Sequence, residues 1–444
     1  MVKMYRVGRR TLSVFILIAI AVLGMGFYVV RYFIYGSTWV AAPFNSTVFA
    51  SGTLVTGRVT DRNGVVLADV TDGVRTFAEG SDVRRSTLHA VGDREGNIGV
   101  GALRVYASQL IGYNPITGAY TFGSSARGNT LKLTIDSRLH VEALRALDGR
   151  RGVVMVSNYK TGEILCMVSS PTFDPINPPV IVDDEEGVYL NRGIQAAYTP
   201  GSIIKVITAA AAIENINDIY IRSFTCTGEM RLGDDTVTCP SVHGTIGFEE
   251  GMRVSCNIVY GSLALELGAD TLFDYTHRYG LSDRTTVGGI ATMSGNFTKA
   301  QDGSADLAWS GVGQYMNLVN PASMLRFVGA VANDGVAMDL YFLSRSGVSS
   351  VLPSSSHRLL SRETAFELGN IIEVQNRAAF PGLDIYAKSG TAQVGGDKAP
   401  HAWYVGYITN PNHPYAFVVI VENGGGGTAN AAPIANRVLQ EAVK

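Results

Sequence analysis

A long uncharged run near the N-terminus constrains this chain more than any other feature. Leu12 to Val30 contains no charged side chain, and about 20 apolar residues are enough to cross a bilayer as a helix. The charged residues before the run are all basic: Lys3, Arg6, Arg9 and Arg10. By the positive-inside rule that end stays in the cytoplasm and the rest is exported. A cleaved signal peptide is the alternative, but its apolar region is shorter, about 7–15 residues. We therefore expect a single-pass, uncleaved anchor.

The exported part has the composition of an ordinary folded protein. The chain has 444 residues, of which 46% are hydrophobic and 17% charged, enough for two folded parts. The formal net charge is −2, and no basic stripe interleaved with aromatic residues occurs. We therefore do not expect the protein to bind nucleic acid.

Hydrophobic periodicity predicts strands at both ends of the main region, with helices between them. We expect a sheet in which the first and last strands meet, of the α+β or α/β class with antiparallel strands. A hairpin is expected around Asn63-Gly64, within Gly57–Ala68. The other expected strands are Leu131–Asp136, Val153–Val156, Glu163–Val168, Trp403–Tyr407 and Tyr415–Val421, and the expected helices are Leu139–Leu147, Ile203–Ile213 and Ala429–Val443.

The first motif with chemical content is Thr199-Pro200-Gly201-Ser202-Ile203-Ile204-Lys205. Ser202 opens the predicted helix, and Lys205, three residues on, shares its face. A serine hydroxyl becomes a good nucleophile when a neighbouring group takes its proton. A lysine does this when burial and nearby cations lower its pKa. A helix-capping serine followed by a surface lysine is the alternative.

Two further motifs follow in the chain. Ser255-Cys256-Asn257 offers a hydroxyl that can relay protons and an amide that can bind a substrate amide. Lys388-Ser389-Gly390-Thr391 on a strand offers a positive charge and hydroxyls for a carboxylate, and Gly390 would leave room for a ligand along the strand edge. A helix cap and an edge strand with a solvated lysine are the alternatives.

In this order the three motifs resemble the signature set of the penicillin-recognising serine enzymes. From about Arg58 onward the chain resembles a class B penicillin-binding protein. The resemblance also rests on the segments Gly57–Gly64, Gly162–Leu165, Ser170–Pro175, His243-Gly244, Ala332–Gly335 and His401–Gly406. It departs from the family at Ser389, where Thr is commoner, and at Tyr315, where a second Gly is frequent, so Gln314 and Tyr315 receive no role.

The resemblance implies a role for each motif residue. Ser202 would be the nucleophile, Lys205 its base and Ser255 the proton relay. The substrate would be bound by Asn257, Lys388, Ser389, Gly390 and Thr391. Backbone N–H groups of Ser202 and Thr391 would form the oxyanion hole. No cofactor and no metal is implied.

The resemblance also implies the architecture. A penicillin-binding or β-lactamase-like transpeptidase domain, an antiparallel sheet flanked by helices, would follow a small β-rich stalk and a transmembrane helix. The expected division is a cytoplasmic tail at 1–10, an anchor at 11–35, a stalk or dimerisation-like module at 36–130 and the transpeptidase domain at 131–444.

The implied activity is that of a peptidoglycan D,D-transpeptidase in a bacterial cell membrane. It would cross-link stem peptides and be acylated by β-lactams. A D,D-carboxypeptidase and a β-lactamase are alternatives, although no Glu-x-x-Leu-Asn segment lies between Ser255 and Lys388. A penicillin sensor or a wall-synthesis scaffold is the non-enzymatic alternative. No Glu-Asp dipeptide occurs, so we expect glycan polymerisation to need a separate membrane glycosyltransferase.

The cysteines leave one question open. Cys226 and Cys239 lie in one exported loop, where a disulfide between them and two free thiols are both expected states. A metal site made of these two and His243 is disfavoured, because no Cys-x-x-Cys or His-x-x-x-His pair supports it.

Overall fold

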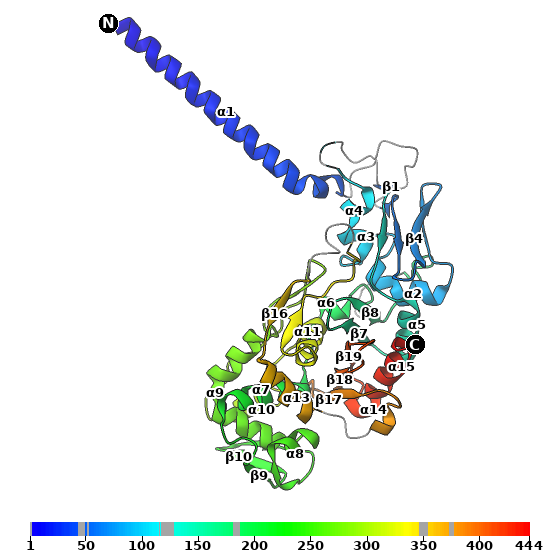
Figure 1. The fold of residues 1–444 in the computed structure, drawn as a ribbon, viewed down its shortest axis with the longest axis vertical. Helices are drawn as coiled ribbons and strands as arrows, with labels where there is room; N and C mark the ends of the chain where they lie inside the picture. The colour runs from blue at the N-terminus through cyan, green and yellow to red at the C-terminus, as the bar shows by residue number, and fades with distance from the viewer. Residues whose placement is uncertain are drawn as a thin grey trace.

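A computed structural model describes residues 2–42, 49–50, 53–114, 116, 128–180, 187–345, 354–372 and 377–444. A long helix, α1 (Val2–Val40), projects from a body that contains two main sheets (Figure 1). The N-terminal sheet lies next to this helix, and the larger sheet and most other helices lie beyond it. The predicted fold class, an antiparallel sheet flanked by helices after a smaller β-rich part, is confirmed.

The larger sheet is antiparallel and has five strands. Their bounds are β7 (Gly152–Asn158), β8 (Ile164–Ser170), β17 (Ile385–Ala392), β18 (His401–Ile408) and β19 (Tyr415–Val421). Their order is β17-β18-β19-β7-β8. β19 pairs with β7, with Val418 opposite Met155, which confirms that the first and last strands meet. β17 stands at one end of this order and carries the third motif.

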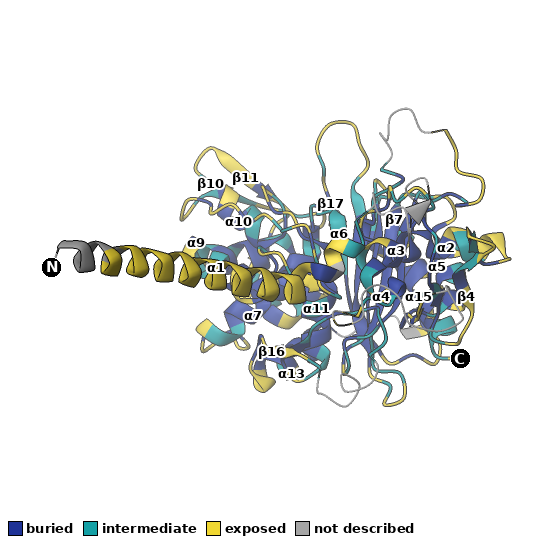
Figure 2. Ribbon diagram, turned by 90° about the horizontal axis from the view of Figure 1, so that it is seen from above, coloured by how far each residue is buried: buried dark blue, intermediate teal, exposed yellow. Residues whose placement is uncertain are grey.

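Helices cover both faces of this sheet, which is why its strands are nearly continuous apolar runs. On one face Val154 and Val419 pack with α5 (Ser137–Leu147) and α15 (Ala432–Ala442). On the other face Met155 and Val418 share a core with α11 (Pro321–Ala332). Figure 2 shows the buried centre of the body and the exposed surface of α1.

A helical half beside the sheet carries the first two motifs. The predicted helix at 203–213 begins as a 3-10 turn, η1 (Gly201–Ile204), and continues as α7 (Lys205–Asn215). It packs against α9 (Asn257–Arg278), which bends at Gly268, where φ is +79°. The remaining short elements after residue 190 are α6 (Arg192–Gln195), α8 (Phe248–Arg253), β13 (Thr286–Val287), β14 (Ile290–Ala291), α10 (Ala305–Gly311), β15 (Val336–Met338), β16 (Ser356–Arg358), α13 (Arg362–Ile371), η2 (Arg377–Ala379) and α14 (Gly427–Asn430).

Two short ribbons connect α7 to α8. Their strands are β9 (Ser223–Cys226), β10 (Glu229–Leu232), β11 (Asp235–Thr238) and β12 (Gly244–Gly247). β9 pairs with β12 and β10 with β11, both antiparallel. Most of their residues are exposed or half-buried; the buried ones are Cys226 and Val237. This region, which we call the ribbon lobe (residues 223–247), therefore brings little hydrophobic core of its own.

The N-terminal sheet has the order β5-β4-β3-β6. Its strands are β3 (Arg58–Thr60), β4 (Val66–Thr71), β5 (Val74–Phe77) and β6 (Thr130–Lys132), and the same part of the chain contains β1 (Phe49–Ala50), β2 (Thr53–Leu54), α2 (Ser81–Val91), α3 (Ala102–Val105) and α4 (Ala107–Ile111). The predicted hairpin is β3–β4. The predicted strand at 131–136 is shorter, because β6 ends at Lys132 opposite Thr60, the last residue of its partner β3, and Asp136 caps α5 by accepting from Arg138 N. Part of the predicted stalk, 43–48, 51–52, 115 and 117–127, lies outside the described residues.

Within α1, Arg10–Gly36 is long and apolar enough to cross a membrane, by length and composition. At about 1.5 Å per residue its 27 residues extend about 40 Å. A membrane anchor and a signal sequence both fit this helix, and the predicted division of the chain into four parts stays a prediction.

Candidate active site

The segment before Ser202 is held against the sheet by backbone contacts. Trp403, fully buried in β18, donates from Nε1 to the carbonyl of Thr199 at 2.9 Å. Gly201 has φ +58° and donates its N–H to Gly313 O at 2.9 Å. A Cβ at Gly201 would lie 2.8 Å from the carbonyl oxygen of Thr391. Glycine is therefore needed here both for its conformation and for the close approach of β17.

Ser202 lies in η1 and is partly exposed, whereas Lys205 is fully buried. Side chains three residues apart nearly eclipse one another in a 3-10 turn. Lys205 begins α7 one turn after Ser202, so the two residues share one side of the helical segment, as the motif spacing predicts.

Ser255 occupies the turn between α8 and α9, with φ +54°. This left-handed conformation is costly for a residue other than glycine and clusters at functional sites. It brings both oxygen atoms of Ser255 to the amine of Lys205: Nζ lies 2.5 Å from Ser255 O and 3.1 Å from Ser255 Oγ. Lys205 Nζ also lies 2.8 Å from Asn257 Oδ1. The first two motifs therefore meet around one buried amine.

The third motif reaches the same point from β17. Lys388, nearly buried, places its Nζ 3.0 Å from Ser255 Oγ and donates to Ser389 O at 2.9 Å. Ser389 is half-buried and Thr391 is exposed, as the alternation along a strand predicts. The hydroxyl of Thr391 accepts a long hydrogen bond from Gly427 N at 3.4 Å.

Gly390 has a packing role in addition to the one predicted. A Cβ there would lie 2.9 Å from Pro200 O, 3.0 Å from Ile203 Cγ2 and 3.1 Å from Trp403 Cβ. The space that a side chain at this position would need is therefore filled by the nucleophile segment of the chain itself, and the predicted contact of Gly390 with a ligand along the strand edge stays a prediction. Glycine at this position lets β17 and η1 approach each other.

Burial lowers the pKa of both lysines, and it lowers that of Lys205 further. Burial first, and the charge of Lys388 second, hold the pKa of Lys205 well below its usual range. Burial lowers the pKa of Lys388 to about 8. Two adjacent ammonium groups in low-dielectric surroundings repel each other. The arrangement therefore favours a neutral amine at Lys205 beside a cation at Lys388.

The side-chain amide of Asn257 already makes two hydrogen bonds within the protein. Its Oδ1 accepts from Lys205, and its Nδ2 donates to Thr238 O at 2.9 Å. A side-chain amide has two donor hydrogens and two acceptor lone pairs. One of each remains for a ligand, which is what the sequence predicts of this residue.

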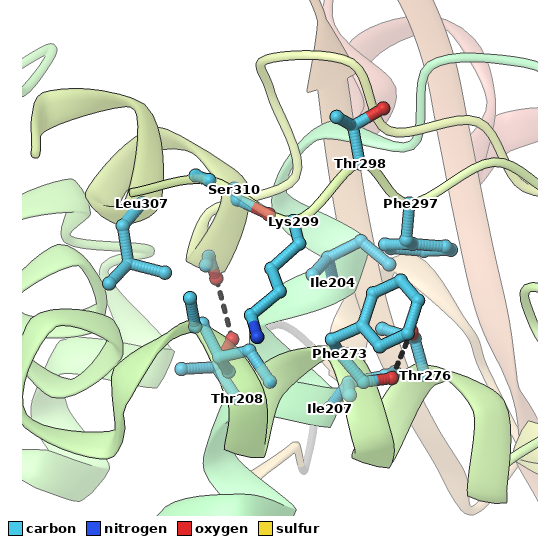
Figure 3. Close-up of a pocket in the computed structure, with 14 residues that line it drawn as sticks. Ile204, Ile207, Thr208, Phe273, Thr276, Phe297, Thr298, Lys299, Leu307 and Ser310 are labelled. Atoms are coloured by element: carbon cyan, nitrogen blue, oxygen red, sulfur yellow. Dashed lines mark hydrogen bonds between the residues drawn. The ribbon is translucent and has the colours of Figure 1, made fainter. Parts of the chain in front are cut away.

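The rear of α7 is packed and contains no substrate-sized space. A cavity of about 20 Å³, the size of a single water, is lined by Ile204, Ile207, Thr208, Phe273 and Phe297. Figure 3 shows these side chains around that of Lys299. Thr208 Oγ1 donates to Gly311 O at 2.6 Å. This packing fixes the helix that carries Lys205.

Four side chains beside the second motif come together in a way that the sequence analysis missed. Cys226, Cys239, His243 and Cys256 have potential ligand atoms within 4.8 Å of one another. No disulfide is formed; all four cysteines of the chain are free. Cys226, Cys239 and His243 lack a metal-ligand spacing in the sequence, and Cys256 belongs to the second motif. The four residues come from the ends of separate strands and the start of a helix, so no short spacing in the sequence marks them as a group.

Tyr315, which received no role, has φ +67°. This left-handed conformation favours glycine, the residue that the related family often carries there. The structure shows it partly exposed in the loop after Gly313.

Comparison with known proteins places the three motifs inside one matched stretch. Residues 152–440 match the family described as penicillin-binding protein transpeptidase domain. The peptidoglycan D,D-transpeptidase PbpA of Mycolicibacterium smegmatis is 29% identical over 365 residues, which are 72% of this chain and 74% of that protein. Stage V sporulation protein D of Bacillus subtilis is 26% identical over 430 residues, 86% of this chain and 65% of that protein. The imipenem acyl-enzyme of penicillin-binding protein A from M. tuberculosis superposes with a TM-score of 0.75 at 25% identity, covering 88% of this chain and 98% of that one.

Proposed function

The chain belongs to the family of penicillin-binding protein transpeptidases, and from this membership we propose that it is a peptidoglycan D,D-transpeptidase that β-lactams acylate at Ser202. The observation that carries the assignment to this serine is the meeting of three motifs at Ser255, with the fully buried amine of Lys205 on one side and Lys388 on the other.

The first half of the reaction forms an ester. The Ser202 oxygen attacks the carbonyl carbon of the penultimate D-Ala, and its proton passes to the neutral amine of Lys205. The carbon–nitrogen bond then breaks, and the departing D-Ala amine takes a proton from the Ser255 hydroxyl, which Lys205 replenishes. Backbone N–H groups of Ser202 and Thr391 hold the negative oxygen of the tetrahedral intermediate.

The second half restores the serine. An amine of a neighbouring stem peptide attacks the ester carbonyl, its proton passes to the Lys205 and Ser255 pair, and the Ser202 oxygen leaves as a hydroxyl. Lys388, Ser389 and Thr391 bind the terminal carboxylate of the donor peptide, and Asn257 binds its backbone amide. A β-lactam enters the same first step, but its leaving nitrogen stays attached through the opened ring.

Two features of the neighbourhood support this division of roles. A neutral Lys205 donates its two N–H groups to Ser255 O and Asn257 Oδ1, which leaves its one lone pair for the proton of Ser202. The ammonium of Lys388 donates to the same hydroxyl oxygen. Ser255 can therefore give its proton to the leaving amine and be reprotonated by Lys205, while Lys388 keeps its own protons and holds the hydroxyl in place.

We also place the protein in a bacterial cell membrane, with residues 1–10 cytoplasmic, 11–35 spanning and the domain at 131–444 outside. The one helix in the described chain that is long and apolar enough to cross a membrane supports this placement. Its partners would be stem peptides and a separate membrane glycosyltransferase, which would contact the anchor and the module at 36–130.

Labelling with a fluorescent penicillin tests the assignment. The variant Ser202→Ala should lose covalent labelling, whereas Ser310→Ala, behind α7 and outside the site, should label like the natural protein. Labelling that persists in Ser202→Ala contradicts the mechanism.

Muropeptide analysis then separates cross-linking from carboxypeptidase activity. Rapid release of the label would favour a β-lactamase.

A further inference from the structure

The cluster of Cys226, Cys239, His243 and Cys256 has the shape of a tetrahedral metal site. The Sγ atoms of Cys226 and Cys239 each lie 3.5 Å from His243 Nδ1, and the Sγ atoms of Cys239 and Cys256 lie 3.9 Å apart. Around a zinc ion with Zn–S bonds of about 2.3 Å and Zn–N bonds of about 2.0 Å, sulfur and nitrogen lie about 3.5 Å apart and two sulfurs about 3.8 Å apart. The observed separations match these edges of a tetrahedron.

The four groups come from four places in the fold. Cys226 ends β9, Cys239 follows β11, His243 precedes β12, and Cys256 caps the N-terminus of α9. Cys226 and Cys256 are buried, and Cys239 and His243 are partly exposed. Cysteines that only fill space in a core are not expected to place three sulfur atoms and a ring nitrogen within 4.8 Å of one another.

The surrounding contacts suit thiolate ligands. Asn257 donates its backbone N–H to Cys239 Sγ at 3.3 Å, a contact that stabilises sulfur carrying negative charge. Cys226 Sγ lies 3.5 Å from Ser241 O, where a thiol proton is accommodated when no metal is bound. Metal binding releases that proton.

The ribbon lobe, residues 223–247, is where such a site would contribute most. Its strands are mostly exposed, so burial of apolar surface does little to hold them. A metal bound at the cluster would tie both ribbons to the start of α9. Small regions without a sufficient core commonly depend on such a cross-link.

We propose that Cys226, Cys239, His243 and Cys256 bind one zinc ion that fixes the ribbon lobe to the N-terminus of α9. Soft thiolate donors in a closed tetrahedral set select zinc and similar ions over calcium or magnesium. All four positions belong to the protein, so the ion is structural and has no open position for catalysis. Because Ser255 and Asn257 flank Cys256, the ion also positions these two residues of the candidate active site.

Metal content of the full chain in detergent tests the proposal. Protein purified with a non-chelating reductant should contain about one zinc per chain by mass spectrometry of the elements. After removal with a chelator, Co²⁺ should bind with the visible absorption of a tetrahedral site and a thiolate-to-cobalt charge-transfer band. No metal above background and no charge-transfer band would overturn it, as would a native disulfide between two of the three cysteines.

Matched variants identify the ligands. Cys226→Ser and Cys239→Ser should lose the metal, whereas Cys166→Ser, buried in β8 and away from the cluster, should retain it. If the serine variants fail to fold, His243→Ala keeps three thiolates and should shift the cobalt spectrum. An unchanged spectrum in His243→Ala contradicts the proposed ligand set.

The link to the active site has its own measurement. Removal of zinc from the natural protein should slow penicillin labelling several-fold, and one equivalent of zinc should restore it. Labelling that is unchanged after complete removal contradicts the positioning role. Metal content and the cobalt spectrum do not depend on transpeptidase activity, so failure of this proposal leaves the proposed function standing.

Discussion

Lys205 and Lys388 direct their amines at the same atom, the hydroxyl oxygen of Ser255, from 3.1 Å and 3.0 Å. They arrive from different parts of the fold, one from the first turn of α7 and the other from strand β17. Both are buried. Two positive charges this close in low-dielectric surroundings repel each other, which favours loss of one proton. Lys205 is therefore the neutral member of the pair and Lys388 the charged one.

Removing each amine should therefore have a different effect. Lys205→Ala should reduce the rate of penicillin acylation by about 10³-fold or more, because the proton acceptor is lost. Lys388→Ala should reduce it by about 10- to 100-fold, because substrate binding weakens while the base remains. Stopped-flow or gel-based labelling rates measure both. Complete loss in both variants would mean that Lys388 also takes part in proton transfer.

Acylation should be fastest near the pH at which Lys205 is neutral and Lys388 is still charged. The pKa of Lys205 is lowered, so the rate rises as pH increases through that value. The pKa of Lys388 is about 8, so carboxylate binding weakens as pH rises through about 8. Lys388→Arg keeps its charge at every accessible pH and should lose the alkaline decline. A decline that stays at the same pH in Lys388→Arg would assign it to another group.

Gly390→Ala should damage both stability and labelling. The added methyl meets the backbone oxygen of Pro200 and the buried side chain of Trp403, neither of which can move freely. Overpacking of this kind costs about 1–3 kcal/mol, and the displaced segment is the one that carries Ser202. Thermal unfolding and the labelling rate report the two effects. Gly99→Ala, where a Cβ meets nothing within 4 Å, is the control; equal behaviour of the two variants would contradict the packing argument.

The protein should cross-link glycan but not polymerise it. The purified protein, given the lipid-linked disaccharide precursor alone, should make no glycan strands on a gel. Cross-linked product should appear when a membrane glycosyltransferase is added. Polymer formed without a partner would show that the chain contains a second activity that its sequence does not reveal.

Much of the site was predictable because its chemistry follows from short motifs in a fixed order. Ser202 and Lys205 are aligned by helical geometry, and the alternation at Ser389 and Thr391 follows from a strand. The meeting of the last strand with the first was also predictable, since both are apolar and flanked by helices.

What the sequence could not predict depends on long-range packing. The space beside Gly390 looked open, because nothing in the local sequence says that Pro200 lies against it. Cys226 and Cys256 come together only after two ribbons and a helix have folded back, so no short spacing marks them as a pair. The early end of β6 likewise reflects the end of its partner strand β3 at Thr60.

β17 ends the larger sheet, and within the described residues no further strand pairs with its outer side. An unpaired edge offers a row of backbone donors and acceptors to any extended chain. A peptide that adds to the edge is read through its main chain, with side chains contributing at alternate positions. A donor stem peptide bound there as proposed would be selected by its extended shape and by its terminal carboxylate near Lys388, rather than by side chains farther along the stem. A rigid molecule that copies this outline competes for the site without resembling the natural peptide in any side chain.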